Sequence, residues 1–404
     1  MKEKDKYNKT TKSKNSQISS INDNGKEFTE SIEELVYLTR FMKALMNSKD
    51  KIPSYIHYQN IINIYHYLCD QLKLNYKKKN ENQIKIRLFG YKFIKNNINK
   101  CSVKINEELK KIEDCEFYEL KKPDTELNII LLKEDDIINM SYMFNDCEAL
   151  QSISGDSKWS TNNVVNMSYM FCNCKALSSL PKFIYNWDTS KVKNMNSMFN
   201  GCESLNEIKN ISKWDTSEVE RMNKMFYGCK ELEDLEDILV WNTKNVIDMS
   251  YMFYNCSKLK NIDLENEKNN KAKWNTEKVT NMSYMFYGCE NLKHLPDSIA
   301  YWNTSEVEFM MYMFYNCKNL TRLPDINKWK TKNISYMNNM FQNCSSLKKF
   351  PDIKNWNIDL LIDISCMFEG CTSLKEFPDL SNWDKIPFKE GKFFEKYFLN
   401  KKFN

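Results

Sequence analysis

Cysteine and histidine are the side chains that could bind a metal or act as nucleophiles, and the 404 residues include 14 cysteines and three histidines. The histidines, His57, His66 and His294, are scattered, which leaves little for general base chemistry or for a zinc site. Nine cysteines recur singly at long intervals, whereas metal sites need converging ligands such as C-x-x-C pairs. The one close pair, Cys172 and Cys174, leaves a redox role open, but we expect buried thiols, no metal and no cofactor.

Other catalytic and nucleic-acid signatures are also missing. Only eight glycines occur, and none forms the phosphate-cradling cluster of a nucleotide-binding loop. Residues 140–383 carry 27 Lys and Arg against 30 Asp and Glu, whereas a nucleic-acid channel would be basic. Residues 73–111, with 12 basic and three acidic side chains, could make a weak contact with an anionic partner, although a solvated basic face is the simpler interpretation. We expect a protein that is not an enzyme and binds no nucleic acid.

The recurring cysteines belong to an internal repeat, M-x-x-M-F-x-x-C-x-x-L. Successive cysteines of the motif lie 27 or 28 residues apart, except for one separation of 33. The motif cysteines are Cys147, Cys174, Cys202, Cys229, Cys256, Cys289, Cys317, Cys344 and Cys371, and the motif phenylalanines are Phe144, Phe171, Phe199, Phe226, Phe253, Phe286, Phe314, Phe341 and Phe368. A unit of about 27 residues therefore occurs nine times. The single insertion falls in a polar stretch before Trp274, where a surface loop can lengthen at little cost.

All nine tryptophans follow the same period, and most are followed by Asp or Asn and then Thr, as in Trp187-Asp188-Thr189. Asp, Asn and Thr at these positions favour a turn, which we expect to be followed by an extended segment. The spacing i, i+3, i+4, i+7 of the Met, Phe and Cys positions predicts two turns of helix or a tight turn. A strand is expected either near the repeat leucine, ended by a proline such as Pro181, or over the Val-x-x-Met stretch, such as 279–282.

A 27-residue unit is too short for two packed helices and suits the range of leucine-rich repeats. We therefore predict an α/β repeat solenoid of about nine coils, each with a short strand and a short helix or turn. Equivalent side chains of stacked coils form continuous columns, so the phenylalanines and cysteines listed above should form a buried core.

Units such as WNTSEVEFMMYMFYNCKNLTRLPDI, residues 302–326, resemble those of the BspA-like leucine-rich-repeat surface proteins. The resemblance covers roughly residues 137–383. It implies a right-handed repeat solenoid that serves adhesion or protein binding, commonly on cell surfaces.

Tyrosines that precede a methionine of the motif are candidates for a partner-facing strip. They are Tyr142, Tyr169, Tyr251, Tyr284, Tyr312 and Tyr336. The equally weighted alternative is that these rings are half-buried between coils and have only a packing role.

Outside the repeats we predict a disordered tail over residues 1–27, an α+β N-terminal module over 28–136 and a C-terminal cap over 384–404. Two amphipathic helices are expected between residues 28 and 74, and strands over 84–89, 101–105 and 127–132. The longest aliphatic run, Ile129 to Leu132, is far too short to cross a bilayer.

We expect a non-catalytic scaffold that presents its repeats to a protein partner. The first 20 residues lack the apolar core of a secretory signal, which predicts a cytoplasmic location. The alternatives are an adhesin of the same fold that reaches the cell surface or the medium by a non-standard route and, with less support, an enzyme located in the N-terminal module.

Overall fold

The computed structural model describes residues 70–121, 125–155, 159–209, 211–260, 274–378, 380 and 383, all within one compact unit that begins at Asp70. The predicted tail, both N-terminal helices up to residue 69, the insertion over 261–273 and the C-terminal cap lie outside these residues. The boundaries proposed for the domains therefore stay predictions.

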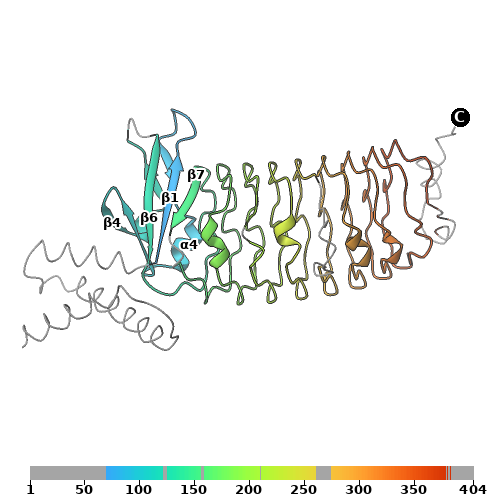
Figure 1. Cartoon of the computed structure of the whole chain (residues 1–404), viewed down its shortest axis with the longest axis horizontal. Coiled ribbons are helices and arrows are strands. Elements are labelled where there is room, and N and C mark those ends of the chain that lie inside the picture. Colours follow the sequence, from blue (N-terminus) through green and yellow to red (C-terminus); the bar gives the residue numbers. More distant parts are fainter. Residues whose placement is uncertain are drawn as a thin grey trace, which may run out of the picture. The chain divides into compact units, whose positions relative to one another are not determined.

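The described part begins with an antiparallel sheet of five strands in the order β4-β3-β6-β1-β7. Its strands are β1 (Asp70–Lys77), β3 (Cys101–Ile105), β4 (Glu108–Lys111), β6 (Glu126–Lys133) and β7 (Leu150–Gly155). A two-stranded sheet pairs β2 (Lys85–Arg87) with β5 (Phe117–Glu119), and one helix, α4, covers Tyr91–Asn96. Figure 1 shows β1, β6 and β7 side by side.

The strands predicted around residues 84–89, 101–105 and 127–132 are confirmed as β2, β3 and β6. The prediction that helix extends to Leu74 is wrong, because β1 begins at Asp70. Leu72, Leu74 and Tyr76 are buried and their neighbours Lys73 and Lys77 are exposed, which is the two-residue period of a strand with one covered face.

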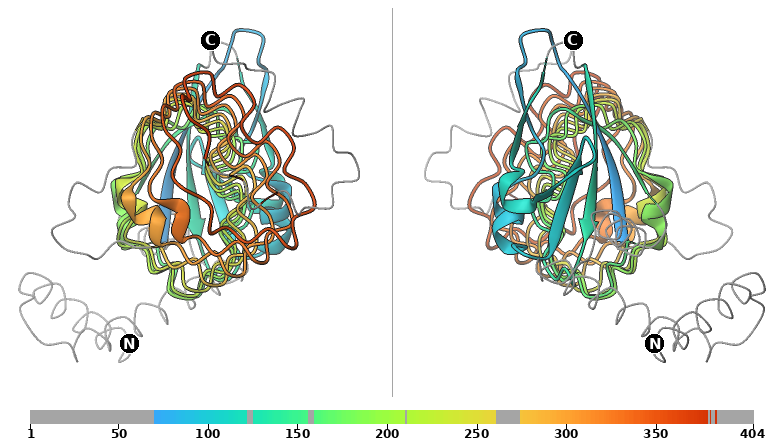
Figure 2. Two further views of the ribbon diagram at one scale, coloured as in Figure 1. Left: turned by 90° about the vertical axis from the view of Figure 1, so that its right-hand side faces the viewer. Right: turned by 90° about the vertical axis from the view of Figure 1, so that its left-hand side faces the viewer.

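The remainder of the described chain is a repeat protein of nine coils, which lie side by side in Figure 1 and overlay one another in the end views of Figure 2. Each coil is joined to the next by one parallel bridge between equivalent residues. We number the coils one to nine by the bridging residue that each contributes, in the order Asn139, Asn166, Asn194, Arg221, Asp248, Asn281, Phe309, Tyr336 and Asp363.

The M-x-x-M-F-x-x-C segment of each coil forms tight turns, so the helical alternative is wrong for it. In the first coil the Met143 N–H donates to the Met140 carbonyl at 3.3 Å, whereas the Phe144 N–H donates to Met170 of the second coil at 2.8 Å. Tyr142 between the two methionines has a φ of 61°. A residue in the left-handed region and N–H groups that point to the next coil are incompatible with continuous i to i−4 helical bonding.

The bridging residues lie in the Val-x-x-Met stretch, and each coil contributes only one of them, so a continuous strand does not form there among the described residues. After the repeat leucine a strand forms in the first coil, as β7. Among the described residues, the corresponding region of four other coils holds a short 3-10 helix, as after Pro181, whose fixed φ suits a helix start. These are η3 (Lys182–Asn186), η4 (Glu236–Ile238), η6 (Asp297–Tyr301) and η7 (Ile326–Lys328). The predicted strand and helix in every coil are therefore replaced mainly by turns held from coil to coil.

The N-terminal strands and helix cover the first coil. The Phe89 ring lies 6.0 Å from that of Phe144, and the Gly90 N–H donates to the Met143 carbonyl at 3.1 Å. The buried Asn97 side chain donates to the Asn139 carbonyl at 2.9 Å. The apolar column of the first coil thus continues into the core of the N-terminal sheet.

Candidate interaction surface

The motif phenylalanines form a buried column through the repeat. Each is at most 6% exposed, and neighbouring rings stack with centroids 5.4 to 6.1 Å apart from Phe144 to Phe368. The methionines of the motif are buried beside them. These side chains fill the interior and offer nothing to a partner.

The motif cysteines are buried in a second column as free thiols. From the second coil onward each thiol donates to the phenylalanine carbonyl of the preceding coil, as Cys174 does to Phe144 at 3.1 Å. Burial raises the pKa of these thiols, which keeps them protonated and poorly nucleophilic. Cys172, the other member of the close pair, is also buried, and burial raises its pKa to about 12.

Among the described residues, no group of three or more His, Cys, Asp or Glu side chains could hold a metal ion. His294 lies in this part of the chain, with its Nδ1 3.4 Å from the Thr321 hydroxyl.

The tryptophan motif also serves the contacts between coils. The Trp214 Nε1–H donates to the Ile184 carbonyl of the preceding coil at 3.0 Å, and the Thr216 hydroxyl donates to the Asn242 carbonyl of the following coil at 3.0 Å. Between them, the Asp215 carboxylate accepts the Ser217 N–H at 2.9 Å and fixes the turn. The contacts between coils therefore account for the recurring sequence of Trp, then Asp or Asn, then Thr.

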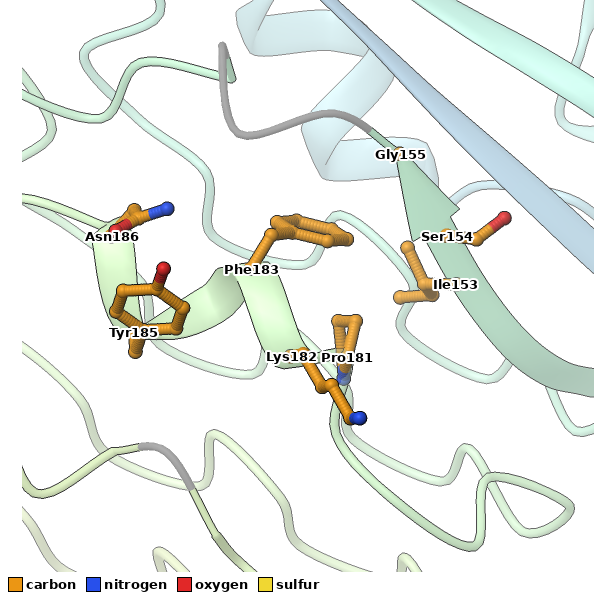
Figure 3. A pocket seen from close by; sticks show the side chains of 8 residues that line it. All are labelled: Ile153, Ser154, Gly155, Pro181, Lys182, Phe183, Tyr185 and Asn186. Atoms are coloured by element: carbon orange, nitrogen blue, oxygen red, sulfur yellow. The ribbon is translucent and has the colours of Figure 1, made fainter.

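One open cavity of about 390 Å³ lies between β7 and η3. Figure 3 shows Phe183 of η3 and the preceding Pro181 near Ile153 of β7. Its other lining residues are Ser154, Gly155, Lys182, Tyr185 and Asn186. Lys182 is the single charged residue of this lining, which contains no Cys, His, Asp or Glu, so the cavity does not point to a particular reaction.

Five of the six tyrosines predicted to face a partner lie in two stacked groups of one column position. Tyr142 and Tyr169 stack at 4.7 Å over the first two coils, and Tyr251, Tyr284 and Tyr312 stack at 4.4 and 4.8 Å over coils five to seven. All five precede the second methionine, and all are half-buried at the surface. Tyr336 is not in this column, because it precedes the first methionine of coil eight and stacks instead on Phe309 at 5.8 Å.

A second column of tyrosines, which the sequence analysis missed, lies beside the first. Tyr227, Tyr254, Tyr287 and Tyr315 follow the motif phenylalanine in coils four to seven and stack at 4.4 to 4.6 Å. Rings of the two columns approach within 5.6 to 6.4 Å at inclined angles. The recurring Phe-Tyr pair in four consecutive units was the signal that could have revealed this column.

We call the seven rings of coils four to seven the tyrosine patch. Its members are Tyr227, Tyr251, Tyr254, Tyr284, Tyr287, Tyr312 and Tyr315. The eighth side chain in the two columns over these coils is Lys224, whose Nζ lies 5.0 Å from the centre of the Tyr251 ring. The patch is therefore aromatic and almost uncharged.

Stacking decides which part of each ring a partner can reach. Because neighbouring rings within a column are nearly parallel, their faces cover one another and leave the ring edges as the part that a partner can reach. Neighbouring hydroxyls of a column also hydrogen-bond to one another, as those of Tyr254 and Tyr287 do. Partial burial and the neighbouring phenols raise the pKa of Tyr284 to about 12. The hydroxyls therefore stay protonated near neutral pH and can both donate and accept hydrogen bonds.

Ion pairs between coils lie on the exposed surface. Lys230 and Glu203 approach to 2.9 Å, as do Lys318 and Glu290, in each case from adjacent coils. Such exposed pairs contribute little to stability, in general about 0 to 1 kcal/mol. We assign them to the solvated surface of the repeat.

The described residues contain no helix that is both long and apolar enough to span a membrane. Neither the curated proteins nor the solved structures give a match to the chain. A family described as Mycoplasma protein of unknown function, DUF285, matches residues 138–267 and again 262–383. These two matches contain the Met, Phe, Cys and Trp positions of all nine coils and cover more than half of the 404 residues. The chain therefore belongs to this repeat family, DUF285.

Proposed function

We propose that this protein is a non-catalytic binding scaffold, in which the nine coils form a leucine-rich-repeat-like solenoid and a protein partner docks along the stacked coils. The parallel bridges between equivalent residues and the continuous Phe and Cys columns support this architecture. The resemblance to BspA-like surface proteins agrees with a binding role.

The tyrosine patch is the observation on which the proposal rests. Phe and Cys occupy their positions in all nine coils, as a structural requirement would dictate, whereas tyrosine fills both surface columns only in coils five to seven. The flanking coils use small or polar residues there, such as Ser197 and Asn200 in coil three and Asn339 and Gln342 in coil eight. The coil thus folds without these tyrosines. A half-buried aromatic cluster at the surface that the fold does not need suggests an interaction site.

Proximity labelling in the native cell tests the proposal. The patch variant combines Tyr254→Ser, Tyr284→Ser and Tyr287→Ser, and the matched control combines Tyr142→Ser and Tyr169→Ser in the other stacked pair. We expect a set of proteins that the wild type and the control label and the patch variant does not. Equal melting temperatures of the purified variants would show that folding is not the cause. Identical labelling by all three proteins would contradict a docking site on the patch.

The same experiment separates the possible locations. An intracellular scaffold labels proteins of the cell interior, whereas an exported adhesin of the same fold labels surface or extracellular proteins. Fractionation of the tagged protein gives an independent answer, and recovery only outside the cell would favour the adhesin. An enzyme in the N-terminal module, residues 28–136, has less support, because the module contains no recognisable catalytic motif.

A further inference from the structure

We propose that the tyrosine patch binds an extended, proline-rich segment in the polyproline II conformation, laid along the stacking direction of the coils. This inference rests on the proposed scaffold function and names the class of partner for the same surface. Three properties of the patch carry it: the groups that the rings present, their spacing and the small area that they expose.

The exposed groups of the patch suit a partner rich in hydrogen-bond acceptors. Stacking leaves the ring edges at the surface, and the edge of an aromatic ring is the positive part of its quadrupole. A polyproline II segment has no internal hydrogen bonds, so its carbonyls are free to accept, and proline contributes no N–H donor. A phenol that exchanges its hydrogen bond to the neighbouring phenol for one to the peptide donates its O–H to such a carbonyl, while the pyrrolidine rings contact the aromatic edges.

The spacing of the rings matches the polyproline II repeat. Two coil steps along either column of the patch amount to about 9 Å between ring centroids. One polyproline II turn of three residues rises roughly 9.3 Å. Every third residue of the peptide therefore meets an equivalent pair of rings, and about six residues suffice to cross coils four to seven.

The exposed area favours a short linear peptide over a second copy of this chain. A tyrosine carries about 200 Å² of surface, and because each of the seven exposes at most about a third of it, they expose at most roughly 500 Å² together. A standard stable interface covers about 800 Å² on each partner. A linear peptide instead gains affinity from a small area because polyproline II is ordered before it binds.

Two other ligand classes fit the patch less well. Sugar rings and unpaired nucleobases bind by stacking on aromatic faces, and here those faces are occupied by the neighbouring tyrosines. A nucleic acid also requires several cations along its backbone, whereas the two columns over these coils contain only Lys224.

Binding of a fluorescein-labelled decaproline to the full chain, followed by fluorescence anisotropy, tests the inference. We expect saturable binding to the wild type, at least tenfold weaker binding to the Tyr254→Ser/Tyr287→Ser variant and unchanged binding to the Tyr142→Ser/Tyr169→Ser control. Tyr287→Phe, which removes one hydroxyl and keeps the ring, should weaken binding less than Tyr287→Ser. A labelled decapeptide of alternating Gly and Ser should not bind.

The results that would overturn the inference are distinct from those that would overturn the scaffold proposal. No saturable binding of decaproline at 1 mM peptide, or equal binding to the patch variant, overturns the peptide assignment. Patch-dependent dimerisation in sedimentation, or patch-dependent binding of a cello-oligosaccharide or oligothymidine in place of decaproline, overturns it in favour of that ligand. If proximity labelling still depends on the patch in any of these cases, the scaffold function stands and only the partner class is wrong.

Discussion

Replacing Phe253 by alanine tests how the repeat is held together. The Phe253 ring is fully buried in coil five and stacks between Phe226 at 5.8 Å and Phe286 at 5.4 Å, so both adjoining coils would line the resulting cavity. Truncating a buried phenylalanine usually costs about 3 to 5 kcal/mol through lost transfer free energy and the cavity. We expect a loss of free energy of unfolding in the upper part of that range.

Phe368 is the matched position in coil nine. It is 6% exposed and stacks on one motif phenylalanine, Phe341, at a longer distance of 6.1 Å, although Phe350 and Phe377 contact it edge-on. Phe368→Ala should therefore cost clearly less than Phe253→Ala. The reason is that a central coil has two neighbours to lose contact with, as stability in repeat proteins comes from nearest-neighbour interfaces.

Urea unfolding followed by tryptophan fluorescence measures both losses, because every coil contains one of the nine tryptophans. Val240→Ala, at a side chain that is 54% exposed, is the control and should change stability by less than about 0.5 kcal/mol. A Phe253→Ala loss as small as that of this control would refute the buried column. Equal losses at Phe253 and Phe368 would show instead that the ninth coil is packed as completely as the fifth.

Four further outcomes are expected. Thr216→Val should cost about 1 to 3 kcal/mol in urea unfolding by leaving a carbonyl of the next coil without its donor, whereas Thr216→Ser should cost less. Gly90→Ala should speed proteolysis between the N-terminal strands and the first coil, because the added Cβ would lie 2.0 Å from the Tyr142 carbonyl oxygen and force the two apart. An unchanged rate of proteolysis would contradict this contact. Burial raises the pKa of the motif thiols above 9.0, so these thiols ionise in the unfolded chain at a lower pH than in the folded protein. Their contribution to stability should therefore be complete below about pH 9, and above it the free energy of unfolding should fall by about 1.4 kcal/mol per pH unit for each such thiol. Urea midpoints measured from pH 8 to 10.5 under reducing conditions would show this fall. Tyr284→Asn should change the melting temperature little and weaken binding to the patch.

The sequence predicts the repeat and its core because both depend on residue types at fixed intervals. A column needs the same side chain every 27 or 28 residues, and that periodicity is visible for phenylalanine, cysteine and tryptophan without any structure. The hydrogen-bond partners of these side chains are harder to predict from the sequence. The Trp214 indole and the Thr216 hydroxyl bond to opposite neighbouring coils, and nothing in their spacing specifies the direction.

The local conformation of the M-x-x-M-F-x-x-C segment could not be decided for a related reason. The intervals i, i+3, i+4 and i+7 place side chains on one face of a helix and equally on the inner side of consecutive tight turns. What distinguishes the two is where the backbone N–H groups point. The Phe171 N–H, for example, finds its acceptor on Met198 in the next coil, 27 residues away, at 2.8 Å. A pattern within one unit does not contain that information.

The backbone of the first tyrosine column separates the demands of the fold from those of a binding site. Tyr251, Tyr284 and Tyr312 have φ values of 58°, 60° and 57°, a left-handed conformation that costs bulky residues roughly 1 to 2 kcal/mol and that asparagine tolerates. Asn339 occupies the equivalent position in coil eight with the same φ of 58°. Backbone strain alone would favour asparagine in every coil. Stacking returns about 0.5 to 1.5 kcal/mol per ring pair, and Tyr284 takes part in four ring contacts, so stacking offsets the strain where neighbouring coils also carry tyrosine. The tyrosines therefore stabilise one another as a run in consecutive coils, and such a run fits the docking surface that we propose.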